Sequence, residues 1–151
     1  MVWTRFALIG LFCTLLSGCF GGDGDERPTG QVSVTVTYKG KPVEGATVTF
    51  ISMENPQPAV GLTNAQGSCS LATYRSGDGA IVGGNMITIV KNDIDKTNVK
   101  PIKPEDQDLV GVSAIPTLKN LLPAKYALPG TSGLKEEVKK GKNSFTYELK
   151  D

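Results

Sequence analysis

The sequence contains no histidine, and this absence limits the chemistry open to the protein. Ser-His-Asp and Cys-His catalytic arrangements and the common zinc sites all use histidine. A paired-carboxylate mechanism does not need it, but the acidic residues fall mostly in predicted turns and in a predicted tether. We therefore expect a protein that is not an enzyme and that holds neither a cofactor nor a metal ion.

Neither sign of charge dominates, because 16 Lys+Arg residues face 15 Asp+Glu residues. The dense basic run Lys139-Lys140-Gly141-Lys142 is short, and we interpret it as a solvated turn. Nucleic-acid binding depends on a basic stripe that can contact many phosphates. The charge pattern therefore predicts no nucleic-acid partner.

No hydrophobic run is long enough to span a membrane, which needs about 20 apolar residues. The longest run, Phe6 to Leu16, has about half the length of a membrane span. Arg5 precedes this run, and Ser17 and Gly18 follow it. A positive charge, a short apolar stretch and small residues in this order are typical of a secretory signal.

The stretch Leu16-Ser17-Gly18-Cys19 resembles the lipobox of bacterial lipoproteins. The resemblance implies that residues 1–18 are a signal peptide cut after Gly18, and that Cys19 carries a diacylglycerol and usually an acylated amino group. Two or three acyl chains hold a protein on a bilayer, whereas one anchors it only marginally. Phe20, rather than aspartate, follows the cysteine, so the resemblance points to an exported protein on the outer membrane. The alternative is an ordinary signal peptide with Cys19 near the cut by chance.

Cysteine is also scarce, with Cys13, Cys19 and Cys69 the three in the chain. If Cys13 leaves with the signal and Cys19 is lipidated, Cys69 has no disulfide partner. Cys69 alternates with polar neighbours in step with Leu71, so we expect it to face the core as a small hydrophobe rather than to act as a reactive thiol.

After the anchor, residues 19–30 are rich in glycine and acids and predict a flexible tether. From Gln31 the apolar residues recur at every second position, which predicts half-buried strands. We expect residues 31–151 to form one all-β domain, an antiparallel β-sandwich of about seven strands. The strands are expected in the stretches QVSVTVTY, ATVTFISM, VGLTNAQGSCSLATY, NMITIVK and SGLKEEVKKGKNSFTYEL. The third stretch predicts a turn at Asn64 to Gly67. The glycine-rich segment Ser76 to Gly84 matches no phosphate-binding motif, and we interpret it as a connection.

Two later segments need separate interpretations. Residues 92–123 contain four prolines and an acidic cluster, and predict a long irregular excursion. The apolar stretch LLPAKYALPGTSGL overlaps its end, and we expect Tyr126 and the leucines to cover the sandwich as a strap. The last strands are expected to form a hairpin across Lys140 to Asn143.

Two motifs and two further segments of the chain carry a resemblance to known proteins. The motifs are at Gly40, Pro42, Val43, Gly45, Ala46 and Val48, and at Thr63, Asn64 and Gly67; the further segments are at Tyr74, Gly77, Asp78, Gly79 and Gly83, and at Leu122, Pro123, Lys125, Tyr126, Pro129, Thr131, Ser132, Gly133 and Leu134. The motifs resemble those of the transthyretin-like or carboxypeptidase-regulatory-like β-sandwich family, with Asn64 in place of the usual acid and Cys69 in place of the usual aromatic residue. With the further segments, the chain also resembles small bacterial lipoproteins built on this domain, which generally have no assigned activity. The resemblance covers most of residues 30–149.

These observations predict a membrane-anchored, non-enzymatic lipoprotein whose β-sandwich is a binding or structural module of the cell envelope. Its partners would be the membrane, through the lipid, and an envelope protein or a glycan. A carbohydrate-binding module is the alternative, and it would have to use tyrosines, since Trp3 is lost with the signal. A hydrolase is less favoured, because the related hydrolase of an oxidised purine product uses histidines.

Overall fold

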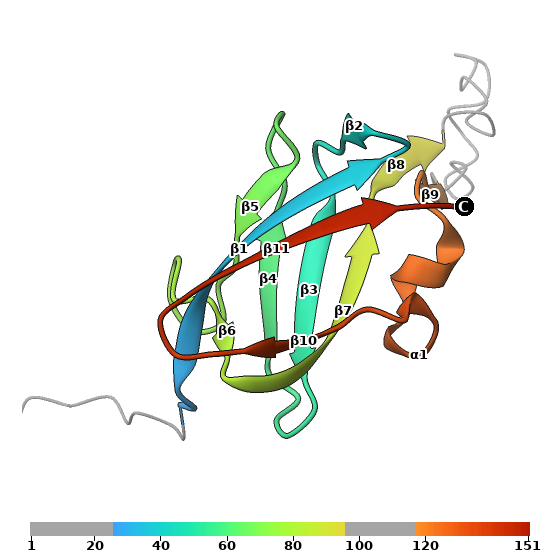
Figure 1. Cartoon of the computed structure of the whole chain (residues 1–151). Coiled ribbons are helices and arrows are strands. Elements are labelled where there is room, and N and C mark those ends of the chain that lie inside the picture. Colours follow the sequence, from blue (N-terminus) through green and yellow to red (C-terminus); the bar gives the residue numbers. More distant parts are fainter. Residues whose placement is uncertain (1–25, 96–116) are drawn as a thin grey trace, which may run out of the picture.

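The computed structural model of the chain describes residues 26–95 and 117–151 (Figure 1). The described residues form eleven strands in sheets of five, four and two strands. Figure 1 shows β1 (Thr29–Tyr38) and β11 (Lys142–Leu149) in one layer and β3 (Thr47–Ser52), β4 (Pro58–Leu62) and β7 (Gly83–Val90) in the other. The predicted all-β sandwich is confirmed and is mostly antiparallel, but it has more strands than the seven expected, and β1 and β11 run parallel.

The first sheet is built around its central strand, β1 (Thr29–Tyr38). On one side, β11 (Lys142–Leu149) runs parallel to it along residues 31–38. On the other side, three short strands pair with it antiparallel in succession, and they are β2 (Lys41–Pro42), β5 (Ser68–Ser70) and β6 (Ala80–Ile81). From Gln31 to its end, β1 therefore has a neighbouring segment on both sides.

The second sheet is antiparallel throughout and has the order β10-β7-β3-β4. Its strands are β10 (Lys135–Val138), β7 (Gly83–Val90), β3 (Thr47–Ser52) and β4 (Pro58–Leu62). The inward faces of the two sheets form one hydrophobic core. As the period-two pattern predicts, the buried side chains alternate along the strands; they include Val32, Val34, Val36, Val48, Phe50, Ile87 and Ile89.

The turn between β4 and β5 forms where the sequence predicts it. The Asn64 side-chain oxygen accepts hydrogen bonds from the backbone N–H groups of Gln66 and Ser68, both at 3.0 Å. Gly67 has φ +73°, and a Cβ there would lie 2.5 Å from the Val36 carbonyl oxygen. The turn therefore needs glycine for both its backbone conformation and its close approach to β1. It carries the chain from one sheet to the other.

The expected closing hairpin at residues 134–149 is wrong. β10 pairs with β7 and β11 pairs with β1, so the two strands belong to different sheets. The Asn143 side chain holds the crossover, because its Nδ2 donates to the carbonyls of Gln31 and Lys139 and its Oδ1 accepts from the Lys139 N–H. Two strands with alternating apolar residues around a short turn are compatible with a hairpin and with a crossover between two sheets. The crossover forms because β1 and β7 each have an edge to which one of the strands can pair.

The expected excursion at residues 92–123 is more ordered at its ends than predicted. β8 (Asn92–Asp95) and β9 (Thr117–Asn120) pair antiparallel, and a 3₁₀ helix, η2 (Ala124–Ala127), and a short helix, α1 (Pro129–Ser132), follow. The residues between β8 and β9 lie outside the described part of the chain. β1 also starts at Thr29, two residues before the predicted domain boundary.

The strap prediction is confirmed for part of its residues. Tyr126 is buried, and its hydroxyl donates to the Lys150 carbonyl at 3.2 Å and accepts from the Lys150 N–H at 3.1 Å. Leu122 is also buried in the core. Leu121 and Leu128 are exposed instead, so these two leucines do not cover the sheet.

Replacing Tyr126 with alanine should lower the free energy of unfolding by about 3 kcal/mol or more, because the change removes a buried aromatic ring. Tyr126→Phe keeps the ring and loses the two hydrogen bonds to Lys150, so it should cost about 1 kcal/mol. Denaturant unfolding of both variants measures the difference. Leu128→Ala is the matched control in the same segment, since Leu128 is 61% exposed. Equal unfolding of Tyr126→Ala and the wild type would contradict the structural role.

Candidate binding surface

A pocket of about 210 Å³ lies beyond the end of β1, where the β1–β2 turn meets the segment after β9. Val43 and Leu122 are buried and form an apolar floor, while Lys41 is exposed at the rim. The lining residues are Tyr38, Lys41, Pro42, Val43, Lys91, Leu121 and Leu122. The pocket therefore combines a small apolar surface with two cationic side chains.

One side chain positions the far wall of this pocket. The Asn120 carboxamide oxygen accepts hydrogen bonds from the backbone N–H groups of Lys91 and Leu122, each at 3.1 Å. The Leu121 N–H donates to the Lys91 carbonyl at 2.8 Å. On the near side, the lining residues Tyr38 and Lys41 flank a tight turn at Lys39 and Gly40, both of which have positive φ. The far wall is thus held by the Asn120 side chain together with one backbone hydrogen bond.

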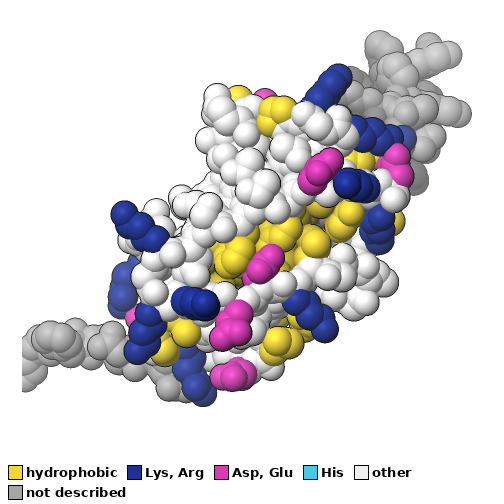
Figure 2. Space-filling view, in the orientation of Figure 1, with side chains coloured by type: hydrophobic (Ala, Val, Ile, Leu, Met, Phe, Trp, Pro, Cys, Tyr) yellow, Lys and Arg dark blue, Asp and Glu magenta, His cyan; other side chains and the backbone are white. Residues whose placement is uncertain are grey.

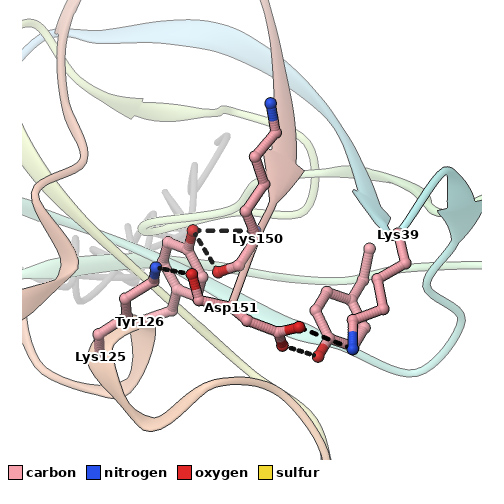
Figure 3. Close-up of polar contacts among 6 residues, drawn as sticks. Lys39, Lys125, Tyr126, Lys150 and Asp151 are labelled. Carbon is pink, nitrogen blue, oxygen red and sulfur yellow. Dashed lines mark hydrogen bonds and ion pairs between the residues drawn. The ribbon is translucent and has the colours of Figure 1, made fainter.

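The charge of the pocket is positive, because Lys41 and Lys91 have no ion-pair partner among the described residues. Asp151 does not pair with either lysine, and it contacts Lys39 and the Tyr38 hydroxyl instead (Figure 3). Its hydrogen bond with Lys39 lowers the pKa of Asp151 below its usual value and raises the pKa of Lys39. Asp151 is therefore charged and already neutralised.

The same cluster keeps Tyr38 in place at the mouth of the pocket. Lys39 Nζ lies 5.0 Å from the centre of the Tyr38 ring, and Lys125 Nζ donates to the Asp151 carbonyl at 2.9 Å. Figure 3 shows Lys39 and Lys125 on opposite sides of Asp151. Because Lys39 and Asp151 are well exposed, their ion pair adds little to stability. Its effect is to orient the Tyr38 side chain.

The tyrosines do not form a shared platform for a sugar. Tyr126 and Tyr147 are buried, with exposed fractions of 7% and 6%. Tyr38 lies at the end of β1, whereas the Tyr74 hydroxyl accepts a hydrogen bond from the Arg27 N–H, just before β1 begins. The two half-buried tyrosines are thus at opposite ends of the longest strand.

The glycine-rich segment after β5 is a connection, as predicted. The Asp78 carboxylate accepts hydrogen bonds from the backbone N–H groups of Thr73, Tyr74 and Arg75 at 2.7 to 2.9 Å. Burial pushes the pKa of Asp78 upward, but the three donors outweigh it and lower the pKa. The N–H groups that a phosphate would need are therefore occupied by the chain's own carboxylate.

Cys69 is half-buried and packs against the core, which agrees with the predicted inward position. A Cβ on Gly61 of the facing strand β4 would lie 3.0 Å from its sulfur, so the packing there is close. Burial raises the pKa of the Cys69 thiol to about 11. The thiol is therefore protonated at neutral pH.

Among the predicted site residues, Gly18 and Cys19 lie outside the described residues, and so does the predicted signal. Within residues 26–95 and 117–151, no helix has the length and apolar character needed to cross a membrane. In the same ranges, no three His, Cys, Asp or Glu side chains gather as a metal-binding group. The pocket was not anticipated from the sequence, because Lys41, Lys91 and Leu122 are far apart along the chain and share no motif.

No protein-family model matches the sequence, and no curated protein matches it. The transthyretin-like and lipoprotein resemblances therefore depend on the motifs in the chain itself.

Thiol reagents should modify Cys69 slowly in the folded protein. Raising the thiol pKa from 9.0 to about 11 lowers the reactive thiolate fraction about a hundredfold at about pH 8. Rapid modification under native conditions, at the rate seen in denaturant, would rule out this environment.

The Cys69 thiol should also affect the free energy of unfolding. Because the pKa is raised in the folded protein, the stability that the thiol contributes is complete below pH 9 and is lost as the pH rises towards 11. Cys69→Ser should lower the free energy of unfolding by about 1 kcal/mol, since a hydroxyl would replace a sulfur that packs on the core.

Proposed function

We propose that this chain is a lipoprotein anchored to a bacterial membrane, with its β-sandwich serving as a non-enzymatic binding or structural module of the cell envelope. The observation that carries the proposal is the sequence Leu16-Ser17-Gly18-Cys19, which ends a short apolar run and precedes the domain. Cys19 would carry the acyl chains, and Gly18 would be the last residue of the signal removed.

The arrangement of the two family motifs supports a transthyretin-like domain. Thr63, from the second motif, is buried, and its Oγ1 accepts from the Ala46 N–H at 2.8 Å and donates to the Val43 carbonyl at 2.6 Å. The Gly45 N–H donates to the Thr63 carbonyl at 2.9 Å. Residues that are 17 to 20 positions apart in the chain therefore form one hydrogen-bonded unit, which gives the pairing of the motifs a physical basis.

Labelled fatty acid should enter the wild-type protein and not Cys19→Ala, because the sulfur of Cys19 is the proposed attachment point. Cys69→Ala is the matched control and should label like the wild type, since its half-buried thiol packs on the core. Metabolic labelling followed by gel analysis measures this. Label in Cys19→Ala at the wild-type level would refute the anchor.

The ligand class that best fits the pocket is a small organic anion with an apolar body. The apolar floor of Val43 and Leu122 would contact the body, and Lys41 and Lys91 would face the charge. The pocket volume of about 210 Å³ is below the usual range for drug-sized ligands, which indicates a small molecule or the end of a larger one. A carbohydrate-binding module remains the alternative, and it would have to rely on Tyr38 at the pocket mouth.

Benzoate should shift the backbone NMR signals of the pocket residues, whereas benzyl alcohol, which has the same ring and no charge, should shift them much less. Changing both Lys41 and Lys91 to glutamine should weaken benzoate binding about tenfold, which corresponds to about 1.4 kcal/mol. Lys135→Gln, on the exposed face of β10, is the control and should leave binding unchanged. Equal shifts with both probes would contradict an anion site, and glycan-array binding lost on Tyr38→Ala would favour the carbohydrate alternative.

A further inference from the structure

The two long sides of the sandwich differ. On one side, the Val60 N–H and carbonyl pair with the Ala72 carbonyl and N–H at 2.9 and 3.0 Å, which joins the second sheet to the chain beyond β5. On the other side, β11 and β10 are the end strands of their sheets, and they do not pair with each other. Figure 2 shows hydrophobic side chains gathered in a band on this face, in the area that β11, β7 and β10 occupy in Figure 1. The sandwich is therefore open along β11.

The outer edge of β11 presents unpaired backbone groups. The backbone groups of Val32 and Val36 in β1 bond towards β2 and β5, so the odd-numbered residues of β1 bond towards β11. In a parallel ladder with this register, the odd-numbered residues of β11 return those bonds. The N–H and C=O groups of Ser144, Thr146 and Glu148 therefore point away from β1. None of the described residues forms a hydrogen bond with them.

β11 lacks the features that usually protect an edge strand. It is eight residues long, it keeps one regular register with β1, and it contains no proline. Its central residues, Asn143 to Tyr147, carry no charge. β10, the other end strand, has only four residues, of which Lys135, Glu136 and Glu137 are charged. Of these two edges, β11 is the one suited to adding a strand.

The sequence of β11 is complementary to itself when two copies run antiparallel. With Phe145 on the two-fold axis, Lys142 lies opposite Glu148 of the second copy, and Ser144 lies opposite Thr146. Both charged residues of the strand thus meet an opposite charge, twice in the dimer. A shift of one residue pair in either direction would instead place Lys142 opposite Lys150 or Thr146. Of the pairings between residues of β11, this register alone places both charged residues opposite an opposite charge.

The inward face of β11 fits the same arrangement. Phe145 is half-buried, and its ring centre lies 5.8 Å from that of Phe50 in the core. On the two-fold axis it would meet Phe145 of the second copy, which would cover the exposed part of both rings. The intrachain contact of Glu148 with Lys150 is long, at 3.9 Å, and both side chains are well exposed. It offers little competition for a cross-strand partner.

We propose that the chain forms a two-fold homodimer in which β11 pairs antiparallel with β11 of a second copy, so that the two β1-centred sheets become continuous. The backbone groups of Ser144, Thr146 and Glu148 supply the hydrogen bonds, and the Lys142–Glu148 pairs set the register. This inference is independent of the ligand pocket and of the lipid anchor.

The test is the dissociation constant of the full chain, measured in detergent by sedimentation over a range of protein concentrations. Thr146→Pro removes an outward N–H that β1 does not use, so the fold should persist while the dimer is lost. Thr146→Val is its matched control and should dimerise like the wild type. Melting of both variants shows whether the proline variant is folded.

Charge reversal provides a second test that leaves the backbone unchanged. Glu148→Lys and Lys142→Glu alone should each weaken the dimer about tenfold, because each places like charges opposite one another twice. The double variant should return to within about threefold of the wild type, since it restores both pairs in reverse. Glu137→Lys, with the same charge change on β10, should have no effect. A monomeric wild type, a dimer that persists in Thr146→Pro, or a double variant no tighter than the single variants would each overturn the proposal.

Discussion

The structure depends on the two-sided pairing of β1. Its valines at alternate positions are buried to within 2% exposure, and its backbone bonds with β11 on one side and with β2, β5 and β6 on the other. A strand buried in this way requires neighbours for every polar backbone group. The neighbours of β1 come from segments between residues 41 and 149. The backbone hydrogen bonds of the first strand are therefore complete only when the last strand has paired with it.

Polar side chains close the connections between these strands. Thr63 joins the end of β4 to the segment from Val43 to Ala46, Asn64 closes the β4–β5 turn, and Asn143 holds the crossover to β11. Asn120 and Asp78 do the same for the pocket wall and the glycine-rich connection. Each of these residues satisfies backbone groups that no sheet neighbour reaches, which explains why short strands suffice for a stable sandwich.

The proposed functional features lie in different places on this frame. The predicted tether leads into the start of β1, while the pocket lies beyond its end, and ten strand residues span about 30 Å. The open edge of β11 runs along the side between them. In the proposed lipoprotein, the ligand site would thus be at the end of the domain remote from the anchor.

The sequence by itself determined the local features: the period-two strands, the turn at Asn64 to Gly67, the inward side of Cys69 and the burial of Tyr126. Each depends on residues close together in the chain, where alternation and turn chemistry act directly. The sequence by itself did not determine to which sheet each strand belongs. The expected hairpin before Leu149 became a crossover, and the excursion at residues 92–123 acquired paired ends in β8 and β9. The pocket and the open β11 edge likewise depend on which residues from distant segments meet. Such pairings are decided by competition among all strands for vacant edges and core space, and only the folded chain settles that competition.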